Sequence, residues 1–255
     1  MGIARSGIVT LTTDFGTADG YAGALRGSVL AAGRGTTVVD VTHEIPAQAI
    51  AEGAFAARTA APSFPPGTVH LVVIDPGVGS GRRLLVIADH GNQRILVAPD
   101  NGVLSYLLDD AGVFEARAID LDAFAQASRT FHGRDVLGPV AGRIAAGADP
   151  AGFGPPAGEL VRLAPYREPV GKREGRILRV DRFGNLVTTL QPVGGDAVVE
   201  VGGIRVRHRV GCYAELPAGE VGWCVGSLGL IEVAVRDGSA AERLGARENV
   251  GVKLL

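Results

Sequence analysis

The sequence is poor in cysteine, and its two cysteines are not placed for a metal site or a disulfide framework. Cys212 and Cys224 lie twelve residues apart in a chain of 255, with no second cysteine or histidine pair at metal-ligand spacing. This arrangement argues against a structural zinc and against a secreted disulfide scaffold. The first residues also lack a long apolar segment before a small-residue cleavage site, so we expect a reducing compartment, the cytoplasm.

Neither one sign of charge nor a long hydrophobic run dominates the chain. Lysine plus arginine number 25 and aspartate plus glutamate 27, which leaves no basic face for nucleic acid. No apolar stretch approaches the roughly 18 residues of a membrane span, so we expect a soluble protein without a membrane partner. Aromatic residues make up only 5% against 38 glycines, so the core must be mainly aliphatic, with many turns.

Residues 1–148 alternate strand-like and helical patterns. Five runs rich in β-branched and apolar residues are typical of strands covered on both faces: Ile8–Thr13, Thr37–Thr42, Thr68–Asp75, Leu84–Asp89 and Ile95–Ala98. Four segments place alanine and leucine at helical spacing: Gly20–Ala32, Ile50–Ala60, Gly102–Asp109 and Asp135–Ala146. The alternation predicts an N-terminal layered α/β domain with a mostly parallel sheet.

The rest of the chain has a different organisation. Five prolines interrupt residues 149–175, which we interpret as a linker or wrapping segment. Residues 176–255 contain short strand-like runs separated by glycines and a weak helical stretch near Ser239–Leu244, which predicts a smaller C-terminal β-barrel. The runs are Ile177–Val180, Leu186–Leu190, Ala197–Val201, Ile204–Val210, Leu230–Val235 and Val250–Leu254.

Polar residues follow the predicted strands of the first domain, where open α/β sheets usually bind ligands. They include Asp14 and Asp75, and a glycine-rich turn with Arg82 comes after Asp75. A dinucleotide-binding turn is excluded, because a strand pattern rather than a helix follows these glycines. A tight hairpin in which Asp75 is only a turn former remains an alternative.

Two further interpretations of these polar residues stay open. His132 and Asp135 precede a predicted helix, so Asp135 could be its N-cap and His132 a loop residue. A metal-dependent phosphoesterase could instead use five of these side chains as ligands: Asp14, Asp75, Asp89, His90 and His132.

Six motifs in a fixed order carry a resemblance to a known family. They are T-D-F-G at 13–16, D-P-G-V-G at 75–79, P-D-N-G-V-L-S at 99–105, T-F-H-G-R-D at 130–135, D-R-F-G-N-L-V-T at 181–188 and G-S-L-G-L-I-E-V-A at 226–234. Together they resemble the S-adenosyl-L-methionine (SAM) hydroxide adenosyltransferases, or SAM hydrolases, which are relatives of SAM-dependent fluorinases and chlorinases. The resemblance implies an α/β domain, a β-barrel domain, and a homotrimer that binds SAM between neighbouring subunits.

The resemblance also assigns site residues. The family's catalytic residues correspond to Asp75, Arg82 and His132, and its ribose-binding aspartate corresponds to Asp14. The remaining substrate contacts correspond to Asn185, Ser227, Glu232 and the backbone at Val235, with Tyr213 and Trp223 as candidate flat walls for the adenine. Thr189 departs from the family pattern, which has asparagine there.

The expected chemistry needs neither a metal nor a cofactor. The sulfonium of SAM leaves as neutral methionine, so the protein has only to activate a water for in-line attack on C5′. Asp75 or His132 can accept the proton, and Arg82 can stabilise the developing hydroxide. The resemblance implies that a halide-using relative has an uncharged residue at the position of Asp75, and an aspartate there would repel chloride and fluoride. A non-catalytic SAM or adenosine sensor would have little use for this cluster.

Overall fold

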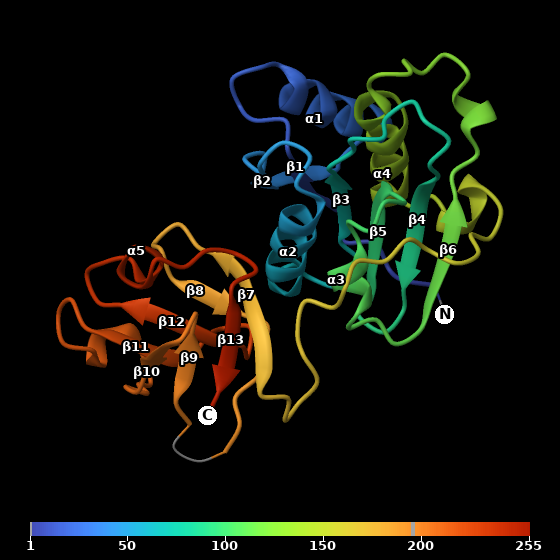
Figure 1. Cartoon of the computed structure of the whole chain (residues 1–255). Helices are drawn as coiled ribbons and strands as arrows, with labels where there is room; N and C mark the ends of the chain where they lie inside the picture. The colour runs from blue at the N-terminus through green and yellow to red at the C-terminus, as the bar shows by residue number, and fades with distance from the viewer. Residues whose placement is uncertain (1, 195–196) are drawn as a thin grey trace. The chain divides into compact units, whose positions relative to one another are not determined.

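The computed structural model describes residues 2–194 and 197–255. The chain divides into two compact units, Met1–Ala164 and Pro165–Leu255, and the division falls within the proline-rich segment 149–175 (Figure 1). The first part of this segment wraps onto the first unit, since Ala157 N donates to Ala116 O at 2.9 Å. Among the described residues, no helix is long and apolar enough to cross a membrane.

A six-stranded sheet forms the centre of the first unit, with the strand order β2-β1-β3-β5-β4-β6. Its strands are β1 (Ile8–Thr13), β2 (Thr37–Thr42), β3 (Val69–Val73), β4 (Leu84–Asp89), β5 (Arg94–Pro99) and β6 (Phe114–Ala118). Strand β4 runs antiparallel to β5 and β6, whereas the other neighbours are parallel. The predicted mostly parallel sheet is confirmed. The short connection 90–93 between β4 and β5 allows only a hairpin, which accounts for the antiparallel strand.

Helices cover both faces of this sheet (Figure 1). α1 (Tyr21–Ala32) and α4 (Gly138–Ala145) pack on one face, against alternate side chains of β3. α2 (Ile50–Ala60) and α3 (Ser105–Leu108) pack on the other face. α1 and α4 approach closely at Gly142, where an added Cβ would lie 2.3 Å from a backbone oxygen of α1. The layered α/β prediction is therefore confirmed.

The direction of β4 separates two groups of polar residues. Asp89 at the end of β4 pairs with Arg94 at the start of β5. Asp89 and His90 therefore lie at the edge where the parallel strands begin. Asp14 and Asp75 follow β1 and β3, so they lie at the opposite edge of the sheet.

The second unit is a seven-stranded antiparallel sheet in the order β10-β9-β13-β7-β8-β12-β11. Its elements are β7 (Glu174–Val180), β8 (Leu186–Thr188), β9 (Val199–Val201), β10 (Ile204–Val206), β11 (Val221–Val225), β12 (Ile231–Val235), α5 (Ala240–Leu244) and β13 (Gly251–Leu254). Beyond β10, His208 O accepts from Trp223 N of β11 at 2.8 Å. This contact joins the two edges of the sheet, and the predicted barrel is confirmed as a near-barrel.

Several elements differ from the sequence prediction. Strands β6 and β11 were not predicted, and the helix predicted over Gly102–Asp109 is limited to α3. Gly102 adopts a φ of +96°, which is incompatible with a right-handed helix and delays its start. Short 3-10 helices add to the described elements at Ala61–Ser63, Leu121–Phe124, Pro150–Phe153 and Tyr213–Glu215.

Candidate active site

Asp75, Arg82 and His132 come together beyond the carboxyl end of β3. Arg82 Nε donates to Asp75 Oδ1 at 2.7 Å, and Arg82 Nη2 donates to Asp75 Oδ2. The same Nη2 lies 3.1 Å from His132 Nδ1. The side chains of Asp75 and Arg82 are only 6% and 8% exposed, so this ion pair is largely shielded from water. A bidentate pair of this kind fixes the guanidinium in one orientation, and Arg82 thereby links the carboxylate to the imidazole.

The glycine-rich segment after β3 folds back so that Arg82 reaches Asp75. Asp75 O accepts from Val78 N at 3.2 Å, which closes a tight turn. Gly79 adopts a φ of +78°, and an added Cβ there would lie 2.5 Å from the carbonyl oxygen of Arg129. The segment is not a hairpin, because β5 lies between β3 and β4 in the sheet. The interpretation of Asp75 as only a hairpin turn former is therefore wrong.

The contact with Arg82 determines which ring nitrogen of His132 carries the hydrogen. A guanidinium only donates, so Nδ1 accepts, and the hydrogen of the neutral ring resides on Nε2. Burial lowers the pKa of His132 below its usual value near 6.5, and the charge of Arg82 lowers it further, against the opposing charges of Asp75 and Asp135. At neutral pH His132 is therefore a neutral imidazole that offers an Nε2–H donor.

His132 lies directly before a π-helix, Gly133–Leu137, which continues into α4. Asp135 is inside this π-helix, so its interpretation as the N-cap of a helix is wrong. The carboxylate of Asp135 instead accepts from Ser128 N at 2.8 Å and from Arg134 Nε at 2.6 Å. These bonds tie the loop that carries His132 to the start of the helix.

Asp14 lines the same cavity as Asp75 and His132, so three of the predicted residues meet there. We call this cavity, of about 320 Å³, the Asp14 cavity; Gln48 also lines it. Gln48 N donates to Asp14 Oδ2 at 2.8 Å. Gln48 takes a φ of 67°, which is uncommon for a residue other than glycine. The backbone at Gln48 thus orients one oxygen of the Asp14 carboxylate.

Three aromatic side chains form an apolar wall next to Asp14. Phe15, Tyr21 and Phe131 contact one another edge to face, with ring centroids 5.5 to 6.3 Å apart. Together with Asp14 they line an adjoining hollow of about 410 Å³. This part of the surface combines flat apolar area with one carboxylate, which suits a ligand with an organic body and hydroxyl groups.

The second unit holds another polar cluster, built around Asn185 and Glu232, both of which are buried. Asn185 donates to the Asp181 carboxylate from Nδ2 at 2.9 Å and from its backbone N at 2.8 Å. Tyr213 donates its hydroxyl to Glu232, and burial together with this bond raises the pKa of the Tyr213 hydroxyl. Gly226 leaves no space beside Glu232, since an added Cβ would lie 1.8 Å from Glu232 Oε1.

The other predicted binding residues differ in their access to a ligand. Ser227 is exposed in the turn between β11 and β12, and Val235 is buried at the end of β12. Tyr213 is 42% exposed and can offer a flat wall. Trp223 is 1% exposed in the core, so its prediction as a wall is wrong. Thr189 is also buried, and its Oγ1 accepts from a backbone N–H of β7 at 3.1 Å, so it serves strand pairing.

Asp89 and His90 do not join the residues around the Asp14 cavity. Asp89 is fully buried and accepts from Arg94 Nε at 2.9 Å, while His90 Nε2 lies 3.6 Å from Glu115 Oε1. Within residues 2–194 and 197–255, no group of three or more His, Cys, Asp or Glu side chains could hold a metal ion. Of the five residues considered as phosphoesterase ligands, Asp14, Asp75 and His132 line one cavity without forming such a group, and Asp89 and His90 lie elsewhere.

Two residues that orient site side chains were not predicted from the sequence. Asp181 opens the D-R-F-G-N motif, so its position before Asn185 was a usable signal. Gln48 contributes only its backbone N–H. Its residue type gives no signal of this role, because every residue except proline has such a group.

The fold and the site define a class: a two-domain small-molecule enzyme with an Asp–Arg–His cluster at the ligand-binding edge of an α/β sheet. Residues 9–154 match the N-terminal domain of the SAM hydroxide adenosyltransferases, and residues 175–253 match the C-terminal domain. The chain belongs to this family, and the resemblance carried by the six motifs is confirmed.

Named relatives and a solved structure agree with this assignment. The chain is 41% identical to the (R)-S-adenosyl-L-methionine hydrolase of Thermus thermophilus, over 97% of this chain and 99% of the relative. It is 37% identical to the hydrolase of the same name from Salinispora tropica, over 93% of each. A fluorinase from Actinoplanes sp. is more distant, at 27% identity over 72% of this chain and 71% of the relative. A crystal structure of an uncharacterized conserved protein from Thermotoga maritima superposes with a TM-score of 0.88 at 30% identity, covering 97% of this chain and all of that one.

Proposed function

We propose that this chain hydrolyses S-adenosyl-L-methionine to adenosine and L-methionine. The observation that carries the proposal is the bonded Asp75, Arg82 and His132 cluster beside the Asp14 cavity, in a member of this family. Incubation of the purified chain with SAM, followed by chromatography, should yield adenosine and methionine in equal amounts. Formation of 5′-chloro-5′-deoxyadenosine in chloride buffer would indicate a halogenase instead, and binding without turnover would indicate a sensor.

The reaction exchanges one bond at C5′ of the substrate. A C5′–O bond forms as the C5′–S bond breaks, and sulfur keeps the electron pair and leaves as the neutral thioether of methionine. This leaving group needs no protonation, so no general acid is required. Water is a poor nucleophile because its pKa is about 15.7, so its proton needs an acceptor and its oxygen needs to be held in line.

Asp75 is the side chain best placed to accept the proton. Nδ1 of His132 accepts from Arg82 and Nε2 carries the hydrogen, so the neutral ring has no further lone pair for water. Each carboxylate oxygen of Asp75 retains a lone pair beyond its bond to Arg82. We therefore assign proton acceptance to Asp75 and water orientation to His132, while Arg82 stabilises the developing hydroxide.

Substitution of Asp14 should weaken adenosine binding as well as turnover. Its carboxylate can accept both ribose hydroxyls, and these bonds exist in the ground state as well as in the transition state. We expect Asp14→Ala to weaken adenosine binding by about tenfold or more, and Asp14→Asn to be intermediate. Calorimetry measures the affinities, with the exposed Asp122→Ala as control. Unchanged adenosine affinity in Asp14→Ala would remove this residue from the site.

Turnover should survive exhaustive dialysis against EDTA. The neutral leaving group needs no Lewis acid, so we propose that neither a metal nor a cofactor takes part. The measurement is adenosine formation before and after dialysis, with zinc or manganese added back to separate samples. A loss of activity that either metal restores would contradict the proposal.

Turnover should be constant near neutral pH and down through 6.5, and should decline only when the pH falls through the lowered pKa of His132. The folded-state pKa of His132 lies below its usual value near 6.5, so the neutral ring persists until the pH drops through that lowered value. The unfolded chain takes up this proton first, so the free energy of unfolding also falls with pH below about 6.5. The difference between wild type and His132→Gln in denaturant unfolding at each pH isolates this residue. A pH-independent difference would contradict the assignment.

We propose that the enzyme is a homotrimer with sites shared between neighbouring subunits. Two observations support this: the polar clusters around Asp75 and Asn185 belong to different units of the chain, and the family pattern assigns both to SAM.

Both cysteines are free thiols, which supports a reducing compartment such as the cytoplasm.

A further inference from the structure

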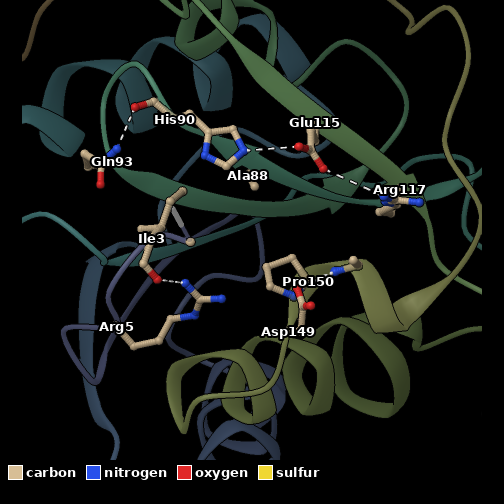
Figure 2. Close-up of a pocket in the computed structure, with 11 residues that line it drawn as sticks. Ile3, Arg5, Ala88, His90, Gln93, Glu115, Arg117, Asp149 and Pro150 are labelled. Carbon is tan, nitrogen blue, oxygen red and sulfur yellow. Dashed lines mark hydrogen bonds and ion pairs between the residues drawn. The ribbon is translucent and has the colours of Figure 1, made fainter.

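A second cavity opens at the edge of the first unit's sheet where the parallel strands begin. We call it the far cavity; it has a volume of about 570 Å³ and shares no lining residue with the Asp14 cavity. Figure 2 shows its walls, which come from the N-terminal residues, the end of β4, the start of β6 and the chain at Pro150. A volume of this size suits a small organic ligand.

Charges of both signs line the far cavity in nearly equal number. The arginines Arg5 and Arg117 line it together with the acids Asp149 and Glu115, and His90 adds a positive charge only when it is protonated. Figure 2 shows Arg5 and Asp149 on one side of the cavity and Glu115 with Arg117 on another. The cavity therefore favours neither a net anion nor a net cation, and each side offers both an arginine and an acid, so a zwitterion can bond to a guanidinium and to a carboxylate.

Acceptors of the protein satisfy only some of the hydrogen-bond donors of the Arg5 guanidinium. Arg5 donates to Ile3 O and, at 3.4 Å, to Ala148 O, so two of the five N–H groups of its guanidinium are accounted for. Its Nε is buried and has no hydrogen-bond partner within residues 2–194 and 197–255. Burial lowers the pKa of Arg5, and Asp149 only partly offsets this effect. The buried Nε is out of reach of a ligand, but a bound carboxylate can accept from the remaining Nη N–H groups and supply a counter-charge.

The acids also retain capacity for a cationic group. Asp149 Oδ1 accepts the backbone N–H of Ala151 at 3.0 Å, which leaves its second oxygen outside that bond. Glu115 lies 3.6 Å from His90 and 3.7 Å from Arg117, which is longer than a good hydrogen bond, and its side chain is 61% exposed. An ammonium group could therefore bond to either carboxylate without displacing a close partner.

We propose that the far cavity binds a zwitterionic α-amino acid with an apolar side chain. Arg5 takes its carboxylate, Asp149 or Glu115 takes its ammonium group, and the aliphatic surface of Ile3 and Ala88 packs against its side chain. The binding is independent of the proposed hydrolysis of SAM, because the two cavities lie at opposite edges of the sheet and are lined by different residues.

Calorimetry with three matched probes tests the need for both charges. The probes are L-leucine, 4-methylpentanoate, which lacks the ammonium group, and 3-methylbutylamine, which lacks the carboxylate. We expect saturable binding of one leucine per chain, with each single-charge analogue weaker by about tenfold or more. Absence of saturable leucine binding, or equal affinity for either analogue, would overturn the proposal.

Substitutions at the far cavity test whether leucine binds there or elsewhere on the protein. Arg5→Gln should weaken leucine binding about tenfold or more, and Ala151→Phe should abolish it by filling the rim while every charge remains. Arg34→Gln, an exposed arginine outside the cavity, should bind leucine as wild type does. Circular dichroism verifies that each variant is folded, and Ala151→Phe keeps the test valid if Arg5→Gln is not. Leucine affinity unchanged in Ala151→Phe would place the ligand elsewhere and overturn the proposal.

Discussion

Replacement of Asp75 by asparagine should lower turnover by roughly 10²- to 10⁴-fold, the range for a positioned acid–base group. Asparagine keeps the shape of the side chain and one acceptor for Arg82, but it cannot take a proton from water. SAM and adenosine should still bind with nearly wild-type affinity. Adenosine formation under single-turnover conditions, together with calorimetric affinity, measures the two effects separately. Near wild-type turnover in Asp75→Asn would remove Asp75 from its role.

Asparagine is preferable to alanine because Asp75 and Arg82 form a buried ion pair. Both substitutions remove the counter-charge of Arg82, but Asp75→Ala also leaves the guanidinium without its acceptors, and breaking a buried pair in this way typically costs about 3 to 5 kcal/mol of folding stability. Asp75→Asn keeps one acceptor and should lose less. A loss of activity in Asp75→Ala would then mix chemistry with unfolding. His132 offers the matched comparison: His132→Ala should lose turnover to a similar extent as Asp75→Asn. His132→Gln should recover part of it, because its amide still donates a hydrogen bond.

Mixing two inactive full-length variants, Asp75→Asn and Asn185→Ala, should restore activity. The first disables the cluster in the α/β unit, and the second removes the amide that is bonded to Asp181 in the near-barrel unit. If each site combines units from neighbouring subunits of a trimer, random mixing in equal amounts gives about a quarter of the sites two intact halves. The recovered turnover should therefore approach about a quarter of the wild-type value.

Subunit exchange has to be demonstrated in the same mixture. Mass-tagged protomers followed by native mass spectrometry report both the exchange and the trimer, and each variant incubated alone gives the background activity. Background activity despite complete exchange would show that each chain builds its own site. A protein that sediments as a monomer and has full activity would also contradict the shared site.

The central strands were predictable because burial on both faces leaves a strong apolar signature. The bounds of the central strands β1 and β4 agree with the prediction at both ends. Those of β2 agree as well, although it is an edge strand without a buried residue, because its β-branched residues favour a strand. The strands that were missed have weaker patterns. β6 is an edge strand that begins at exposed Phe114, and β11 contains Gly222, where an added Cβ would lie 2.3 Å from Leu216. These segments form strands because of tertiary contacts, and the local sequence pattern does not indicate such contacts.

Strand direction explains the main error about candidate ligands. Asp89 and His90 follow a strand as Asp14 and Asp75 do, but β4 runs antiparallel and carries them to the opposite edge. The sequence also left open whether Asp75 or His132 accepts a proton. That distinction depends on a 3.1 Å contact between Arg82 and His132, fifty residues apart in the chain.

The reversed direction of β4 also bears on how such a protein can evolve. The Asp14 cavity and the far cavity lie at opposite edges of one sheet and have no lining residue in common. A mutation that reshapes the far cavity therefore leaves Asp14, Asp75 and His132 in place, and selection can act on the two cavities separately. Descendants of one ancestral hydrolase could thus keep the same chemistry while the far edge acquires, changes or loses a ligand.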